Sequence, residues 1–429
     1  MRCINAEEAR KLASFRVKEH LRLALLEGFL EGEKTEATYI CLECFKDEWL
    51  RGRAEPLMEP RSCAVCGDVV TKAQTPSKIA SIVREPLQKH FIIDYGLYPG
   101  YEMTLTQVIE RTIGCSSAEI CNAVAQLLVE SDAEEEDFYF EGQEYSWAPS
   151  PFESEEHCRW WVEGDWEEVA TQLTHGQRFF NDKAKKFFES LIFEALWSHK
   201  EEAVGKPSAV KKLPAGTVFY RARIANSLAD VRRFQGDPEA ELGAPPKDRA
   251  ANNRMSAAGV PLMYVSGDSE TCIAEVRPSI GDEVVLAQFT STEEFLFFDF
   301  TALDCLEHDP ISLFSPSYED RTQRRLLLDY LHDLIARPVR KGDTDYVMTQ
   351  ALAECIRFSE HGFDGVAFRS VQRSDGGINY VLFDKNASEG MKNPNWKPKF
   401  SLETSTQAVS VHKVNGVMYY SDPISDVSR

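Results

Sequence analysis

The sequence has no long apolar run and no excess of positive charge. No stretch approaches about eighteen uncharged apolar residues, so we expect neither a membrane span nor a membrane partner. The 69 acidic residues outnumber the 48 lysines and arginines and leave a net charge of −21. Because each phosphate contact needs a Lys or Arg, this balance disfavours nucleic acid as a partner.

Other signals are missing as well. The N-terminus is charged throughout and lacks the apolar centre of a signal peptide. The eleven cysteines are odd in number and scattered, apart from one group of four, which favours a reducing compartment. We therefore expect a cytoplasmic protein. No GxGxxG or Walker-type loop is present, so neither a Rossmann nor a P-loop nucleotide site is expected.

What the chain does contain indicates several domains. A length of 429 residues is too great for one core, and an apolar content of 43% is enough to bury more than one. Residues 6–31 place apolar side chains from Leu12 to Leu30 at helical spacing. We expect an N-terminal helix in 1–36, a cysteine module in 37–75, a mainly helical domain in 76–204, a further domain in 205–390 and an extension in 391–429.

The fold class expected of residues 205–390 is mixed α+β. Short β-rich runs such as "TVFYRARI", "EVVLAQF" and "NYVLF" alternate there with helical patterns at 269–277 and 319–361. A zinc ribbon and then a mainly helical domain would precede this one.

Four cysteines form the clearest local motif. Cys41 and Cys44 make one CxxC pair, and Cys63 and Cys66 make another after a gap of eighteen residues. Two such pairs place four thiolates tetrahedrally around Zn²⁺, about 2.3 Å from the metal. With all four positions taken by protein, the zinc of this ribbon is expected to be structural rather than catalytic.

Charged and polar residues recur in three runs of the C-terminal half. "TVFYRARI" carries Arg221, "NNRMSAAGVPLMYVSGDSETCIAE" carries Arg254, Tyr264 and Glu275, and "GFDGVAFRSVQRSDGGINYVLFD" carries Ser370. Each of these residues alone is more often a packing or surface residue than a catalytic one. Their joint occurrence indicates a site.

These ordered runs resemble the RES domain, a family named for its Arg, Glu and Ser. The resemblance covers about 205–386, and the ten positions from Arg254 to Tyr264 and eleven from there to Glu275 agree with the family pattern. Two positions depart from it: Asn253 precedes Arg254, and Ser256 stands where the family has Asn. The resemblance implies a fold like that of diphtheria-type ADP-ribosyltransferases and a substrate, NAD⁺, that is broken down or whose ADP-ribose is transferred.

The chemistry of NAD⁺ cleavage suits these residue types. Loss of nicotinamide passes through an oxocarbenium-like state, and the carboxylate of Glu275 would stabilise its positive charge. Arg221 and Arg254 would bind the diphosphate through bidentate charge-assisted bonds. Tyr264 would stack on the nicotinamide or ribose, and Ser370 would hydrogen-bond the amide or ribose.

Further residues are expected to support this pocket. Arg223 shares a strand face with Arg221, and Asn379 lies on the strand after Ser370, so both are assigned to NAD⁺ binding. Tyr346, Gln350 and Glu354, in "DYVMTQALAECIR", recur at helical spacing and are expected to brace the pocket from behind.

The N-terminal half resembles the zinc-ribbon and HEPN-like region that accompanies some RES domains. The shared features are the two CxxC pairs, Trp166, and "RFF" at 178–180. HEPN ribonucleases carry an Arg and His a few residues apart. Arg84 and His90 meet that spacing, with Pro86 between them, but so do Arg325 and His332 in the other domain, so the pattern carries little weight.

Three functions follow from these resemblances. The first is an NAD⁺ glycohydrolase acting as a bacterial toxin or anti-phage defence effector. The second is an ADP-ribosyltransferase that modifies a protein or small molecule. The third is a HEPN protein that binds or cuts RNA and carries a degenerate RES domain, which the acidic net charge disfavours. For the first we expect restraint by a partner such as an antitoxin, by the N-terminal half or by homo-oligomer assembly.

Overall fold

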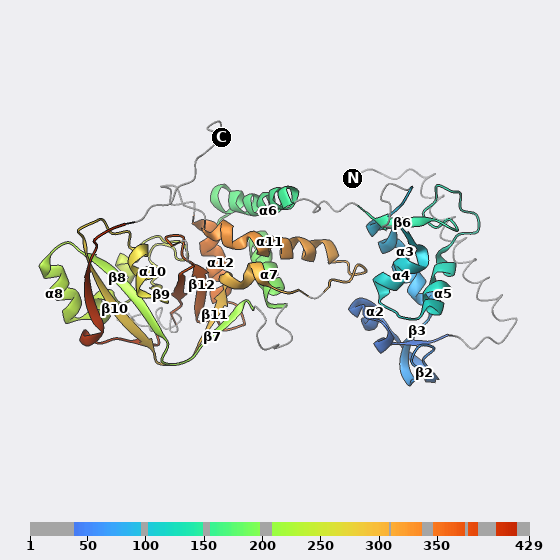
Figure 1. Cartoon of the computed structure of the whole chain (residues 1–429), viewed down its shortest axis with the longest axis horizontal. Helices are drawn as coiled ribbons and strands as arrows, with labels where there is room; N and C mark the ends of the chain where they lie inside the picture. Colours follow the sequence, from blue (N-terminus) through green and yellow to red (C-terminus); the bar gives the residue numbers. More distant parts are fainter. Residues whose placement is uncertain are drawn as a thin grey trace, which may run out of the picture. The chain divides into compact units, whose positions relative to one another are not determined.

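The chain divides into two compact units (Figure 1). The first comprises Met1–Ser150 and Ser312–Tyr318, and the second comprises Pro151–Ile311 and Glu319–Arg429. The computed structural model describes residues 38–95, 102–148, 155–197, 208–308, 310–336, 346–373, 376–384 and 400–417. The helix expected in 6–31 lies outside these residues.

The described part of the first unit contains two three-stranded sheets and several short helices. In chain order its elements are β1 (Ile40–Cys41), η1 (Leu42–Cys44), α2 (Glu48–Gly52), β2 (Glu55–Ser62), β3 (Val69–Gln74), α3 (Pro76–His90), β4 (Phe91–Ile93), β5 (Met103–Thr104), α4 (Leu105–Ile113), α5 (Ala118–Leu128) and β6 (Glu144–Trp147). The sheet orders are β1-β3-β2 and β4-β6-β5.

Local sequence signals explain the helices of this unit. The Thr75 side chain accepts a bond from the backbone of Lys78 and begins α3, with Pro76 at the first helical position. Helix α3 continues through Pro86 and buries one apolar face, which packs with α4 and α5 into a single core. Phe314, from the segment that the chain contributes later, is 5% exposed within the same core.

The described part of the second unit holds the long sheet and its covering helices. Its elements are α6 (Glu155–His175), α7 (Asp182–Trp197), β7 (Val210–Leu213), β8 (Val218–Ala225), α8 (Leu228–Gly236), α9 (Pro238–Leu242), η2 (Lys247–Arg249), β9 (Met263–Ser266), α10 (Ser269–Glu275), β10 (Glu283–Ser291), β11 (Phe295–Asp299), η3 (Phe300–Cys305), α11 (Tyr318–Ala336), α12 (Val347–Arg357), β12 (Gly365–Arg369), β13 (Ile378–Leu382), β14 (Leu402–Glu403), η5 (Thr406–Ala408) and β15 (Val409–Lys413).

A nine-stranded sheet forms the centre of the second unit. Its order is β14-β10-β8-β9-β13-β12-β11-β7, and β15 also pairs with β10. Among the described strands of this sheet, all pairs are antiparallel except β11 with β12. The mixed α/β class expected for this region is confirmed. Residues 402–413, within the expected extension, add β14 and β15 to the sheet edge.

Helices cover the sheet on both faces. Apolar side chains of α6, α7, α11 and α12 form one core with Phe298, Val366 and Val381 of the strands. Phe219, Phe297 and Tyr380 belong to a second core with α8 and α9, so the sheet is buried on both sides. Helices α6 and α7 fall inside the expected helical range 76–204 but pack with the second unit. Among the described residues, no helix combines the length and apolar character needed to cross a membrane.

A buried ion pair fastens α7 to α11. The carboxylate of Glu194, 2% exposed, accepts bonds from Arg321 and, at 3.1 Å, from the Nε atom of Arg325. Replacing one partner of such a network leaves the other charges buried and unpaired.

We predict that Glu194→Gln lowers the free energy of unfolding by about 3 kcal/mol. Glu189→Gln is the matched control on the same helix, because Glu189 is 56% exposed and pairs with Lys185 only at the surface; it should cost less than about 0.5 kcal/mol. Urea unfolding followed by circular dichroism measures both. Equal effects of the two substitutions would contradict the assignment.

Candidate active site and metal centre

A cleft of about 440 Å³ opens in the second unit where β8 and β9 part. These strands pair only at Tyr220 and Ser266 in the described residues, and beyond that pair they diverge. Residues of both strands, of α10, of the loop before β9 and of the β12–β13 hairpin line the cleft, together with the residue that precedes α12; they include Arg221, Arg254, Tyr264, Cys272, Glu275, Arg277, Tyr346, Phe368 and Asn379.

Glu275 ends α10 and is fixed by two hydrogen bonds. Its Oε1 atom accepts from Ser370 Oγ at 2.6 Å and from Asn379 Nδ2 at 2.6 Å. Both donors are buried, whereas Glu275 is exposed in the cleft. Among the described residues none donates to Oε2. One oxygen is therefore held by the protein while the other remains able to contact a ligand.

The two donors are themselves oriented. Ser266 Oγ donates to Asn379 Oδ1 at 2.7 Å, which leaves the amide nitrogen of Asn379 to face Glu275. Ser370 Oγ accepts from the backbone N–H of Gln372 at 3.1 Å, so its own hydrogen is available to Glu275. The carboxylate is thus positioned before any ligand binds.

The β12–β13 turn lies close against α10 because of a glycine. A Cβ atom at Gly377 would lie 1.9 Å from Oγ1 of Thr271, a residue of α10 that is fully buried. The Gly377 carbonyl also accepts from the backbone of Ser370 at 2.7 Å. Glycine here lets the hairpin approach the helix that carries Glu275.

Guanidinium groups supply positive charge to the cleft. Arg221 bridges the diverging strands by donating to the Tyr264 carbonyl at 3.0 Å, and burial lowers its pKa to about 10, so it stays charged at neutral pH. Burial also lowers the pKa of Arg254. Arg277 lines the cleft with φ of 48°, a left-handed conformation uncommon for a non-glycine residue. Three cations beside one carboxylate favour an anionic ligand that also carries a partial positive centre.

Arg223 does not join this group. It lies on the same strand face as Arg221 but is absent from the cleft lining, and Glu241 of α9 and Arg249 are among its charged neighbours. Burial lowers its pKa. Alternation along β8 indicated a shared face, but the cleft extends only over the part of the strand where β9 has just diverged.

Tyr264 helps to hold the loop that carries Arg254. Its hydroxyl accepts from the backbone N–H of Met255 at 3.1 Å and shares a hydrogen bond with Ser256 Oγ at 3.1 Å. Burial raises the pKa of Tyr264 to about 12. Ser256, which stands in the place of the expected Asn, thus ties the Arg254 loop to β9.

Several cleft residues were not foreseen. Phe368 lies two residues before Ser370 on β12, so strand alternation could have indicated it. Cys272 lies three residues before Glu275 on α10; burial raises its pKa to about 12 and keeps the thiol protonated. Arg277 follows the end of a short helix, and no periodicity points to it. Tyr346, expected to brace the pocket from behind, lines the cleft itself.

Residues 218–405 match the family model of the RES domain. This part of the chain is a RES domain. The family is generally related to NAD, so this domain belongs to a family of NAD-using enzymes. No curated protein matches the chain. The HEPN resemblance of the N-terminal half has no such support and stays a prediction.

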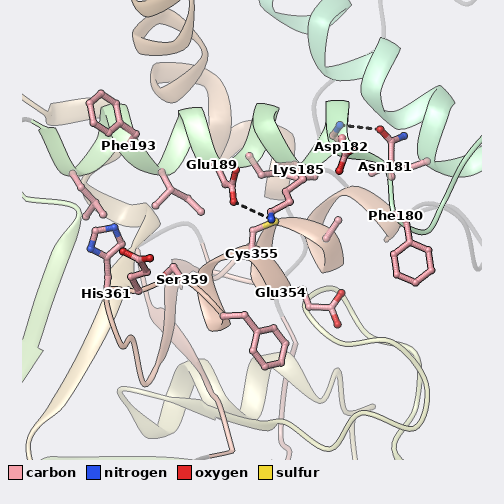
Figure 2. A pocket seen from close by; sticks show the side chains of 18 of the residues that line it. Phe180, Asn181, Asp182, Lys185, Glu189, Phe193, Glu354, Cys355, Ser359 and His361 are labelled. Atoms are coloured by element: carbon pink, nitrogen blue, oxygen red, sulfur yellow. Dashed lines mark hydrogen bonds and ion pairs between the residues drawn. The ribbon is translucent and has the colours of Figure 1, made fainter.

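A larger hollow of about 1070 Å³ lies elsewhere in the second unit, between α7 and α12 (Figure 2). Glu354, expected to brace the active site, lines this hollow instead. Figure 2 shows Lys185 beside Glu189, 3.7 Å apart, above Cys355. Burial raises the pKa of that thiol to about 11, so it is protonated at neutral pH. The hollow thus combines apolar walls with paired charges.

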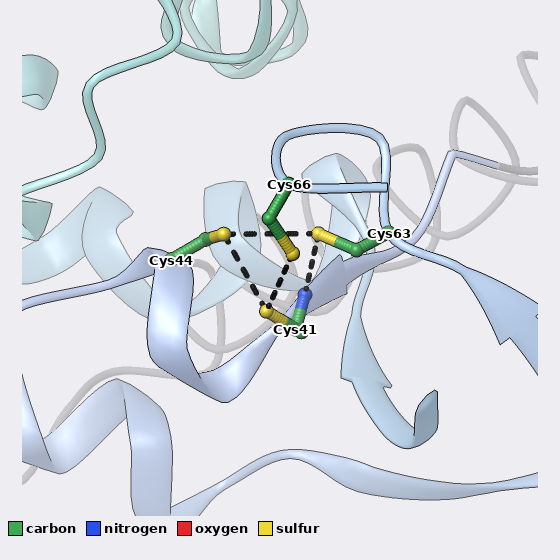
Figure 3. A group of neighbouring side chains, drawn as sticks. All are labelled: Cys41, Cys44, Cys63 and Cys66. Carbon is green, nitrogen blue, oxygen red and sulfur yellow. Dashed lines mark hydrogen bonds between the residues drawn. The ribbon is translucent and has the colours of Figure 1, made fainter. Parts of the chain in front are cut away.

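In the first unit, the four cysteines meet as the spacing predicted (Figure 3). Their sulfur atoms lie within 4.8 Å of one another, with Cys41 to Cys44 at 3.4 Å and Cys41 to Cys66 at 3.6 Å. Four sulfurs about 2.3 Å from one central ion would be about 3.8 Å apart. Backbone N–H groups of Cys41 and Val65 also donate to the sulfur of Cys63, as they would to a metal-bound thiolate. The cluster therefore fits a metal ion.

The Arg84–His90 pattern is engaged in packing. Arg84 donates to Glu130 at 2.6 Å and to the Leu128 carbonyl, and its guanidinium lies over the Tyr139 ring. His90 packs edge-on against Tyr318. The arginine of the second copy, Arg325, pairs with the buried Glu194. Both arginines thus have structural partners.

The buried hydroxyl of Tyr264 predicts a pH dependence. In the unfolded chain it ionises near 10 and in the folded chain near 12, so the unfolded state loses its proton first and stability falls as pH rises from about 10 to 12. Tyr264→Phe loses the hydrogen bonds of the hydroxyl, so it should be less stable than wild type at pH 9. It should also lose less stability between pH 9 and 11.5, because it has no phenol to ionise. Thermal unfolding at the two pH values measures this. An equal loss in both proteins would show that Tyr264 ionises normally.

Proposed function

We propose that the RES domain is an NAD⁺ glycohydrolase that cleaves the nicotinamide–ribose bond. The observation that carries the proposal is the carboxylate of Glu275, anchored through Oε1 by Ser370 and Asn379 with Oε2 left for a ligand. A preorganised carboxylate is what an oxocarbenium-like state requires, because it meets the developing charge without having to reorganise.

The bond changes follow from this arrangement. The C–N bond breaks with its electron pair passing to the pyridinium nitrogen, which leaves as neutral nicotinamide. Glu275 Oε2 stabilises the positive ribose carbon and accepts a hydrogen bond from a ribose hydroxyl. A water molecule then attacks that carbon and loses its proton to solvent, which yields ADP-ribose.

The remaining cleft residues suit the other parts of NAD⁺. Arg221, Arg254 and Arg277 would bind the diphosphate through charge-assisted bonds. Phe368 and Tyr264 offer aromatic surface for the nicotinamide or ribose. Ser370, which is 5% exposed and bonded to Glu275, would act through that carboxylate rather than on the substrate.

We predict that Glu275→Gln lowers kcat for nicotinamide release by about 10²- to 10³-fold, since it removes one preorganised charge. Glu270→Gln, in the first turn of the same helix, is the control and should keep wild-type rates. Chromatography of reactions with NAD⁺ would score free nicotinamide and ADP-ribose. Nicotinamide release that Glu275→Gln leaves unchanged would refute the assignment; nicotinamide without free ADP-ribose would indicate transfer to an acceptor instead.

The biological role that we propose rests on this activity. Hydrolysis consumes NAD⁺ instead of recycling it, so an active enzyme depletes its cell. We infer a toxin or defence effector whose activity is restrained until needed. Expression of the full chain without any loss of cellular NAD⁺, followed by loss once the N-terminal half or a partner is removed, would support this inference.

We also propose that the cysteine cluster binds structural Zn²⁺. The donor set of four thiolates and their spacing support zinc, and the cluster leaves no protein position open for a substrate. The ion would hold η1 and the β2–β3 hairpin, whose strand β2 has a largely exposed surface.

We predict that Cys44→Ser reduces bound zinc from about one ion per chain to near none and lowers the unfolding temperature of the first unit. Cys305→Ser, at an exposed cysteine outside the cluster, should retain the metal. Elemental analysis and calorimetry would be the measurements. Full zinc content in Cys44→Ser would rule out this site.

A further inference from the structure

Helix α12 contacts the loop that carries Arg254. Two consecutive residues near its start, Thr349 and Gln350, direct their side chains to this loop. Thr349 is buried and its Oγ1 donates to the backbone carbonyl of Arg254 itself. The loop has no long regular hydrogen-bond ladder of its own; Asn253 and Ser256 form an isolated bridge.

Gln350 makes most of these contacts. Its Nε2 atom donates to Asn252 Oδ1 at 2.8 Å, to the Asn253 carbonyl at 2.8 Å and to the Ser256 carbonyl at 3.0 Å. An amide nitrogen has two hydrogens, so three acceptors imply a shared bond. All three partners are oxygen atoms, so each of them needs a hydrogen-bond donor.

The loop is therefore held on both sides of Arg254. Gln350 and Thr349 hold it from α12, and the Tyr264 hydroxyl holds Met255 and Ser256 from β9. A guanidinium whose backbone is anchored loses less conformational freedom when it binds an anion, which increases affinity.

We propose that Gln350 is a positioning residue that sets the place of Arg254 and thereby the affinity of the RES cleft for the diphosphate of NAD⁺. The proposal rests on the proposed function for its substrate but not for its geometry. Gln350 lines no part of the cleft and does not touch the reacting atoms. Its loss should therefore weaken substrate binding more than the chemical step.

The first test reads the geometry without any substrate. Gln350→Met keeps the side-chain length and removes the donor. We expect amide hydrogen exchange in residues 250–257 to become at least about tenfold faster, because the loop loses three of its bonds. Glu354→Gln, one turn further along α12 and lining the other hollow, is the control and should leave exchange there unchanged. Unchanged exchange in Gln350→Met would overturn the proposal.

The second test separates binding from chemistry. We expect Gln350→Met to raise KM for NAD⁺ about tenfold with kcat within about twofold of wild type. Thr349→Val removes the hydroxyl that donates to the carbonyls of Arg254 and, within its own helix, Tyr346. It holds the loop at one point only, so it should raise KM in the same direction by a smaller factor. Gln350→Glu should raise KM more than Gln350→Met does, since its carboxylate would face three oxygen acceptors. A fall in kcat at constant KM would overturn a positioning role toward the diphosphate.

The results distinguish a failure of the proposed function from a failure of the positioning role. If wild type releases no nicotinamide but exchange in 250–257 rises in Gln350→Met, the NAD⁺ assignment fails and the anchoring of the loop stands. If wild type cleaves NAD⁺ and neither exchange nor KM responds to Gln350→Met, the positioning role fails and the proposed function stands.

Discussion

The hydrogen bonds accepted by Oε1 of Glu275 connect the parts of the RES domain on which the site depends. Glu275 ends α10, while its donors Ser370 and Asn379 come from the β12–β13 hairpin. The bonds therefore join a helix to a hairpin that lies about a hundred residues later in the chain. Gly377 permits the close approach that they need, because any side chain there would collide with Thr271. Loss of these contacts would free the carboxylate from both of its hydrogen-bond donors. It would also separate the hairpin from α10.

The rest of the site follows from the way the strands part around this carboxylate. β8 and β9 share one described pair, and Arg221 then donates to the Tyr264 carbonyl across the gap. The opening that results lies beside Glu275 and receives Arg254 from a loop anchored at both sides. Helix α12 has its early residues against that loop and its later residues against the hollow beside α7. The same helix thus contacts the loop that carries Arg254 and lines a second, larger depression.

Sequence patterns predicted much of this arrangement and missed what depends on long-range contacts. The strands carrying Arg221, Tyr264 and Asn379, the helix carrying Glu275 and the four-cysteine cluster all agree with the structure, because alternation, helical spacing and ligand spacing are local. Arg223 was wrongly assigned to the cleft, because the alternation of residues along β8 does not show where β9 diverges from it. Ser370 contacts Glu275 rather than open space, and Phe314 joins the core of the first unit. Neither pairing leaves a local signal.

The most direct test of the central claim is a crystal structure of the Glu275→Gln variant soaked with NAD⁺. We predict that the nicotinamide-bearing ribose lies against the side chain of residue 275, with its diphosphate contacting Arg221 and Arg254. NAD⁺ bound elsewhere, for example in the hollow between α7 and α12, or a ribose turned away from residue 275, would contradict the role given to this carboxylate.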